Sequence, residues 1–151
     1  MNNSIQIEQL IKARKLNSDE EFELFEEAIE RLQGNIDIDD VYEICDAFCD
    51  DTKDDETMFE IIHLIEQLQG DEYLKCIAIC SPGMVEAHEW AMTLNKRIIN
   101  SQRYFKKYID VIEKLEKADK EKILKLLLDV KNDNPNRFAA KVDLIYEKVM
   151  Y

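Results

Sequence analysis

The 151-residue sequence contains only three glycines and two prolines, the residues that most often interrupt regular secondary structure. This scarcity leaves no glycine-rich loop of the kind that binds phosphate. No segment combines period-two alternation of apolar residues with hairpin turn signals, so we expect no strands. The few breakers stand where helices are expected to start or stop. The sequence therefore predicts an all-α fold.

Histidine is equally scarce, with only His63 and His88 in the chain. His63 lies in an apolar segment, and we interpret it as a core or boundary residue rather than a metal ligand. His88 lacks the second histidine of a zinc-protease helix, and the chain has no G-x-S-x-G motif. We expect no enzyme activity, no catalytic residue and no cofactor. A metal-dependent hydrolase built from Asp and His is the least favoured reading, and it would need metal to co-purify.

Basic residues are rare in the first half of the chain. Residues 1–75 contain 6 Lys or Arg against 22 Asp or Glu, whereas residues 76–151 contain 14 against 11. The whole chain carries a net charge of −13. Such a field repels nucleic acid and anionic membranes, and it speeds encounter with cationic proteins. We expect no direct nucleic-acid binding and no membrane binding.

Long apolar runs are absent, and the first residues, MNNSIQIEQLIKARK, do not show the basic start and apolar core of a secretory signal. We expect a soluble, cytoplasmic protein. The four cysteines form two i, i+4 pairs, Cys45 with Cys49 and Cys76 with Cys80. Because cytosolic thiols stay reduced, we interpret them as small buried apolar groups and expect no metal. A zinc or iron–sulfur site is the less favoured alternative.

Apolar spacing and capping residues predict nine helices. Ser18 and Glu21 form a capping box before the second helix, and Gly34 ends it. Ser81 followed by Pro82 predicts the N-terminus of the sixth helix. The apolar stripe of the second helix consists of Phe22, Phe25, Ile29 and Leu32. The helices are expected at about residues 4–15, 18–33, 37–48, 56–69, 71–80, 81–99, 101–117, 119–131 and 134–150.

Helices of this length with short links are expected to form antiparallel pairs within a single domain, residues 1–151. Stacking of successive pairs predicts a HEAT-like α-solenoid, and an irregular helical bundle is the alternative. No exact repeat of fixed period is present, so the pattern leaves both the solenoid and the bundle open. The sequence does not determine the oligomeric state.

The segment CDDTKDDE, residues 49–56, places five carboxylates around one lysine. A calcium-binding hand needs a glycine at its sharp turn, and this segment has none. A solvated loop whose acidic residues complement the dipole of the next helix explains part of the charge. A surface that binds a basic partner also explains the aspartates before residue 49.

Trp90, Leu94 and Arg97 follow at i, i+4 and i+7 and share one face of a helix. We favour a core tryptophan with Arg97 covering its edge or pairing with a carboxylate. The alternative is a pair of binding anchors, for which Tyr42 and Tyr73 are further candidates.

The run EWAMTLNKRIIN, residues 89–100, resembles the W-x(6)-R-[IL]-[IL]-N signature of the immunity protein 30 family. The matching residues are Trp90, Arg97 and Asn100. Upstream, DDETMFEIIHLIEQL is similar to that family's acidic entry into an apolar helix. The resemblance implies an all-helical bacterial protein of the cytoplasm that blocks a polymorphic or contact-dependent toxin domain delivered by a neighbouring cell. It implies no catalysis.

Charge and resemblance together predict how the partner binds. Toxin domains that act on nucleic acid have basic substrate clefts, which a negative face can cover by steered association. We therefore expect the C-terminal domain of a cognate toxin, of the basic nuclease type, as the partner. The alternative is a helical-repeat scaffold or adaptor without a toxin partner. The expected docking residues are Asp39, Asp40, Asp46, Asp50, Asp51, Asp54, Asp55 and Glu56.

Overall fold

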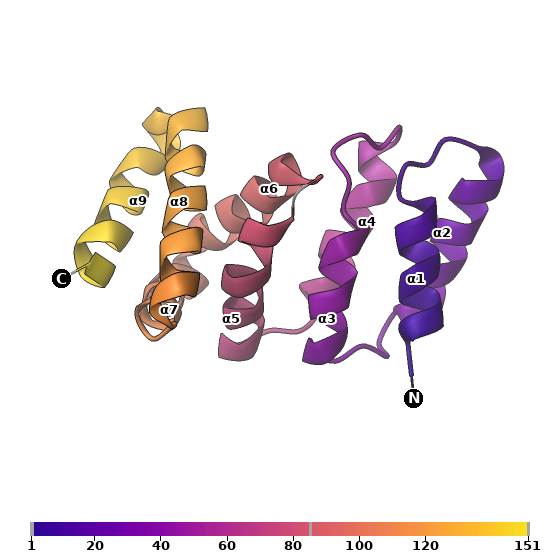
Figure 1. Ribbon diagram of the computed structural model, residues 1–151, viewed down its shortest axis with the longest axis horizontal. Coiled ribbons are helices and arrows are strands. Elements are labelled where there is room, and N and C mark those ends of the chain that lie inside the picture. The colour runs from indigo at the N-terminus through magenta and orange to yellow at the C-terminus, as the bar shows by residue number, and fades with distance from the viewer. Residues whose placement is uncertain (1, 85, 151) are drawn as a thin grey trace. The chain divides into compact units, whose positions relative to one another are not determined.

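The computed structural model describes residues 2–84 and 86–150 of the chain (Figure 1). Over these residues the chain forms nine α-helices and no strand, which confirms the all-α prediction. The chain divides into two compact units. The first contains Met1–Gln69 and Met84–Trp90, and the second contains Gly70–Gly83 and Ala91–Tyr151. The single domain and the HEAT-like arrangement stay predictions.

The first unit is built on the hairpin of α1 and α2, which lie side by side and antiparallel (Figure 1). α1 also packs against α3, and α2 packs against α4. A 3-10 turn, Cys45–Ala47, continues α3. The helices of this unit are α1 (Ser4–Ala13), α2 (Asp19–Leu32), α3 (Ile38–Ile44) and α4 (Asp55–Ile65).

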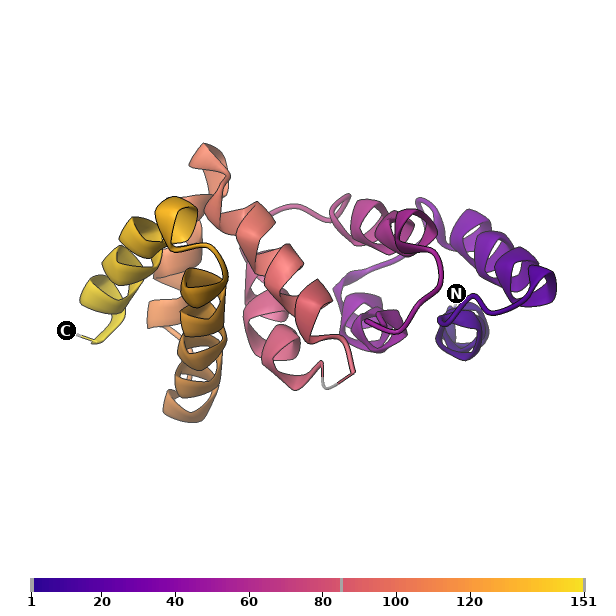
Figure 2. The ribbon, with the colours of Figure 1, turned by 90° about the horizontal axis from the view of Figure 1, so that it is seen from above.

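In the second unit, α5 packs against α7 and α8, and α9 packs against α7 and α8. The paired α8 and α9 can be followed in Figure 2. A 3-10 turn, Ser81–Gly83, follows α5 directly. The helices are α5 (Asp71–Cys80), α6 (His88–Ile99), α7 (Gln102–Glu113), α8 (Lys117–Asp133) and α9 (Pro135–Met150). The first turn of α6, up to Trp90, belongs to the first unit.

The apolar helix predicted near residues 56–69 is largely buried, although α4 ends earlier, at Ile65. Complete burial of an aliphatic side chain contributes about 1.5–3 kcal/mol, so this helix supplies much of the core. Its buried apolar residues are Met58, Ile61, Ile62, Leu64 and Ile65.

The stripe predicted on the second helix is correct except at Phe22. Phe25, Ile29 and Leu32 are buried, but Phe22 is 40% exposed. Phe22 lies in the first turn of α2, one turn before the part of that helix that the core covers.

Local capping determines where several helices begin. The Ser18 hydroxyl accepts a hydrogen bond from the Glu21 amide at 3.1 Å, as predicted. The Glu21 carboxylate bonds to the Asn17 amide rather than to that of Ser18. A complete capping box occurs instead at α3, between Asp37 and Asp40. Polar side chains at helix N-termini thus bind amides that have no partner within the helix.

The predicted start of the sixth helix at Ser81 and Pro82 is wrong, because α6 begins at His88. Ser81 is the C-cap of α5, and its hydroxyl is an acceptor for the side-chain amide of buried Asn95 at 3.0 Å. The Asn95 carbonyl oxygen in turn accepts a hydrogen bond from Tyr108. Burial raises the pKa of Tyr108, so this hydroxyl stays protonated and can donate.

Gly34 provides a test of how α2 ends. Its φ of +73° lies in the left-handed region, and no atom lies within 4 Å of where a Cβ would stand. We expect Gly34→Ala to lower the free energy of unfolding by about 1 kcal/mol through backbone conformation alone. Gly83→Ala is the matched control, because a Cβ at Gly83 also meets nothing and its φ is not left-handed. Urea unfolding followed by circular dichroism measures the stability of both variants. Equal stabilities would contradict the left-handed conformation of Gly34.

Candidate functional site: an ordered acidic surface

The acidic segment 49–56 is held by backbone hydrogen bonds to distant parts of the first unit. The Asp50 amide donates to the Glu86 carbonyl at 2.9 Å, and the Lys53 amide donates to the Lys15 carbonyl at 2.9 Å. Within the segment, the Thr52 amide donates to the Cys49 carbonyl at 3.3 Å. The segment is therefore an ordered part of the fold rather than a loose solvated loop.

The carboxylate of Asp50 binds the N-terminus of α6. Its two oxygens accept hydrogen bonds from the amides of Glu89 at 3.0 Å and Trp90 at 3.3 Å. These amides have no partner within the helix, and a negative charge also complements the positive end of the helix dipole. Asp50 thus caps a helix that begins 38 residues later in the sequence.

Trp90 secures the same junction from the apolar side. Its indole N–H donates to the Cys49 carbonyl at 3.1 Å. The ring stacks on Phe48 with centroids 5.8 Å apart, and it meets Phe59 edge-on at 6.2 Å. Only 8% of Trp90 is exposed, which confirms the core interpretation of this residue.

The other motif residues, Arg97 and Asn100, belong to the second unit. Arg97 is exposed, and Asn100, just after α6, is half-buried. Their part in binding stays a prediction. Tyr42 and Tyr73 are the further candidates for binding anchors. The prediction is wrong for Tyr73, because this residue is only 6% exposed, whereas Tyr42 is half-buried.

Arg14 is a structural residue that the sequence reasoning missed. Its guanidinium donates to the carbonyls of Asp46 at 3.2 Å and Phe48 at 3.3 Å, and it pairs with the Glu86 carboxylate. A half-buried cation thus organises the backbone just before the acidic segment. The available signal was its rarity, because Arg14 is one of only six basic residues in the first 75.

The eight predicted docking residues all lie in the first unit, where they divide into two groups. Asp40, Asp50 and Asp54 bind parts of the fold through their carboxylates, although Asp50 is exposed as well. The other five are exposed, and we call them the acidic face: Asp39, Asp46, Asp51, Asp55 and Glu56.

Asp40 and Asp54 show what the first group does. The Asp40 carboxylate accepts hydrogen bonds from the Asp37 amide at 3.1 Å and the Asn3 side chain at 2.8 Å. Asp54 is the N-cap of α4 and accepts from the Thr57 amide at 3.1 Å. Hydrogen bonds from the backbone and side chain of Thr57 lower the pKa of Asp54. Both residues thus act on local structure.

No group of His, Cys, Asp and Glu in residues 2–84 and 86–150 is arranged to hold a metal ion. Cys45, Cys49 and Cys76 are buried thiols, which agrees with their interpretation as small buried apolar groups, whereas Cys80 is half-buried. A hydrogen bond with Cys80 and burial both raise the pKa of Cys76, which disfavours the thiolate that a metal would need.

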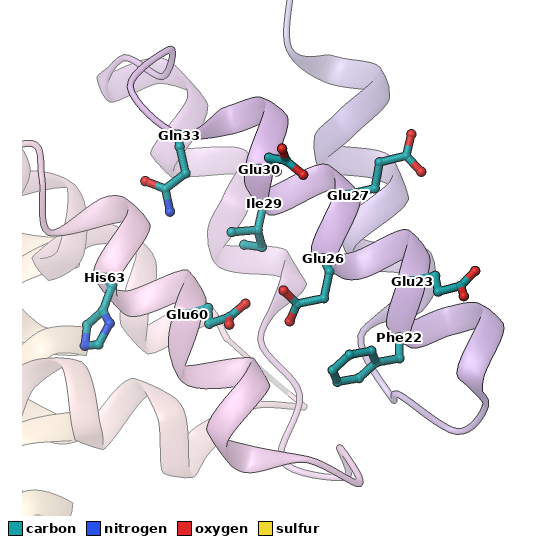
Figure 3. Close-up of a pocket in the computed structure, with 9 residues that line it drawn as sticks. All are labelled: Phe22, Glu23, Glu26, Glu27, Ile29, Glu30, Gln33, Glu60 and His63. Carbon is teal, nitrogen blue, oxygen red and sulfur yellow. The ribbon is translucent and has the colours of Figure 1, made fainter.

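A groove of about 660 Å³ between α2 and α4 is a second feature that the sequence reasoning did not identify (Figure 3). Its lining includes five glutamates and neither lysine nor arginine. Figure 3 shows the carboxylates of Glu26 and Glu60 pointing toward one another across it. The lining residues are Phe22, Glu23, Glu26, Glu27, Ile29, Glu30, Gln33, Glu60 and His63.

The pair of Glu26 and Glu60 is electrostatically unfavourable when both residues are ionised. Burial, followed by hydrogen bonding to Glu26 and repulsion from Glu26 and Asp54, raises the pKa of Glu60 to about 7. The Oε2 atom of Glu60 is buried and has no donor in the protein. A proton on Glu60 lets its carboxyl group donate a hydrogen bond toward Glu26. His63, expected in the core or at its boundary, is exposed and meets Phe59 edge-on.

Fold and site together define an all-helical protein with an ordered, strongly negative surface. None of the helices in the part of the chain described here is both long and apolar enough to span a membrane. The sequence model of the family described as Immunity protein 30 matches residues 12–108, so the chain belongs to the immunity protein 30 family. Membership implies an immunity protein directed against a toxin, and the family is generally not enzymatic. No curated protein and no solved structure matches the chain.

The cap that Asp50 supplies can be tested against its neighbour. We expect Asp50→Ala to lower the free energy of unfolding by about 1–2 kcal/mol, because two amides of α6 lose their acceptor. Asp51→Ala, at the adjacent exposed position, should change it by less than about 0.5 kcal/mol. Asp50→Asn should fall between them, because it keeps one acceptor oxygen. Urea unfolding measures all three, and equal stability of the Asp50 and Asp51 alanine variants would exclude the capping role.

The Glu26 and Glu60 pair predicts a stability that depends on pH. Glu60 holds a proton in the folded state up to about pH 7, whereas its ordinary pKa is 4.5. The contribution of this proton to the free energy of unfolding is therefore complete below pH 4.5 and is lost as the pH rises through 7. At pH 8, Glu60→Gln should raise the Tm by roughly 2–4 °C, on the order of 1 kcal/mol after solvent screening. At pH 5 the gain should vanish.

Glu43→Gln is the control for this experiment, because it removes an exposed carboxylate outside the groove. Thermal unfolding of the three proteins at both pH values separates the effects. A gain from Glu60→Gln that is the same at pH 5 and pH 8 would contradict the raised pKa of Glu60.

Proposed function

We propose that the protein is a cytoplasmic immunity protein that binds and neutralises the C-terminal domain of a cognate polymorphic or contact-dependent toxin. Membership of the immunity protein 30 family is the observation that carries this proposal. The neutralisation is by binding, without turnover. The toxin domain is of the basic, nuclease type, and the acidic face lies over its substrate cleft.

The charge of the first unit supports a basic partner. This unit contains five Lys or Arg against 22 Asp or Glu, a balance of −17. Excess charge of one sign destabilises a compact fold through self-repulsion, so a balance this negative favours a use in steering and binding.

The order of the acidic segment supports the same proposal. Asp51 and Asp55 are exposed, yet the backbone between them is fixed by the bond from Lys53 to Lys15 and by the cap at Asp54. Charges on a fixed backbone lose little conformational entropy when a partner binds, which favours affinity. The carboxylates of the acidic face take the place of the nucleic-acid phosphates in the toxin cleft.

Co-expression tests the function directly. The tagged protein is produced together with the C-terminal domain encoded immediately upstream, and both growth and co-purification are measured. A toxic domain whose effect is relieved, with recovery of a tight complex, is the expected result. Absence of both toxicity and complex would overturn the proposal and favour a scaffold or adaptor.

The acidic face is tested by removing charge without touching the caps. We expect the variant Asp39→Asn, Asp46→Asn, Asp51→Asn and Asp55→Asn to bind the toxin domain at least about tenfold more weakly, with a flatter salt dependence. Its helicity should not change, because these side chains are exposed. Affinity is measured by calorimetry at two or more salt concentrations.

The matched control removes four exposed carboxylates from the second unit. It carries Glu113→Gln, Glu116→Gln, Glu121→Gln and Glu147→Gln. Equal affinity of the two quadruple variants would show that total charge, rather than the acidic face, determines binding.

A further inference from the structure

We infer that the groove between α2 and α4 receives an arginine side chain of the partner, whose guanidinium lies between the carboxylates of Glu26 and Glu60. These residues are separate from the acidic face, so the inference adds a second contact region to the proposed function on which it rests. The proposed occupant of the groove is a cationic side chain of a protein rather than a metal ion. The shape of the groove, its chemistry and the charges around it support this inference.

The groove is apolar at one end and polar at the other. Its volume of about 660 Å³ falls in the range of roughly 300–1,000 Å³ typical of ligand sites. Ile29 lies on α2 between the glutamates, and Phe22 lies at one end of the groove (Figure 3). At the other end, Gln33 accepts a hydrogen bond from the Gln67 side chain at 2.7 Å, which ties α2 to the residues after α4.

The unsatisfied atom in the groove is an acceptor. When Glu60 is ionised, its buried Oε2 atom has no donor in the protein, although a buried acceptor ordinarily has one. Glu26 faces it from α2, so a donor placed between them would bind both carboxylates. A planar guanidinium offers several N–H donors in a fixed fork and stacks on aromatic rings, here that of Phe22, which is 40% exposed.

The charged groups around Glu60 leave the groove negative. Glu60 faces Glu26 on α2, and three further glutamates of α2 line the same groove: Glu23, Glu27 and Glu30. Arg31 pairs with Glu27 at 2.8 Å and offsets that carboxylate only. From its own side of the groove, Asp54 adds repulsion, and His63 lines the groove one turn further along α4. An incoming cation would thus replace the proton that Glu60 holds.

Binding of the toxin domain tests this inference. The double variant Glu26→Gln and Glu60→Gln should bind at least about tenfold more weakly at pH 8 than wild type. The control double variant Glu8→Gln and Glu113→Gln removes the same charge from exposed positions outside the groove and should bind within about twofold of wild type. Equal affinity of the two double variants overturns the inference and leaves the proposed function standing.

The pH dependence distinguishes direct contact from a structural effect. If the cation replaces a proton, the affinity of wild type should fall by up to about tenfold between pH 8 and pH 6, and the Glu26 and Glu60 double variant should lose this dependence. His63 also lines the groove, so His63→Gln serves as a control that should keep the dependence. A dependence that disappears in His63→Gln and persists in the double variant overturns the inference.

A further experiment needs no toxin domain. Carboxyl carbon NMR of the free protein is recorded with the peptide acetyl-Gly-Arg-Gly-amide and with its neutral citrulline analogue. Shifts confined to Glu26 and Glu60, caused by the arginine peptide alone, support the inference even when the proposed function fails. Shifts spread evenly over all carboxylates, or shifts at this pair with magnesium chloride and none with the peptide, overturn it.

Discussion

The carboxylate of Asp50 and the indole of Trp90 make the junction on which the first unit depends. Asp50 caps the first turn of α6, and Trp90, in that turn, returns a hydrogen bond to the carbonyl of Cys49. Two segments far apart in sequence are thus joined by reciprocal bonds around a buried ring that stacks on Phe48. This junction fixes the backbone from which the acidic segment begins, so the order of the charged surface follows from an interaction in the core.

The same chemical group serves three purposes in this unit. The Asp54 carboxylate satisfies a helix amide, and its pKa falls because hydrogen bonds from Thr57 favour the charged form. Those of the acidic face stay in water, where repulsion is screened. Glu60 faces a second carboxylate at partial burial, and its pKa rises to about 7. The environment therefore makes helix caps, solvated charges and a carboxyl group of raised pKa out of residues of one type.

For an immunity protein, this division has a functional consequence. A mutational survey that treats every aspartate of the first unit as a binding residue would mix loss of contact with loss of stability, because Asp40, Asp50 and Asp54 bind the fold. The exposed residues and the groove are the positions at which charge can be removed with little effect on the core. The two regions are also chemically distinct, since one is open to water and the other has apolar lining from Phe22 and Ile29.

Local pattern determined the helical fold, most helix positions and the buried strip of α4, because caps and apolar periodicity act within a few residues. The W-x(6)-R-I-I-N run of the sequence also indicated the family, which the match over residues 12–108 confirms. The start of α6 was predicted wrongly because its cap, Asp50, is supplied from 38 residues upstream. The role of Arg14 and the facing pair of Glu26 and Glu60 depend on which helices pack together. Composition alone gives the number of carboxylates, whereas tertiary structure decides which are solvated, which are bonded and which repel, because those energies depend on distance and burial.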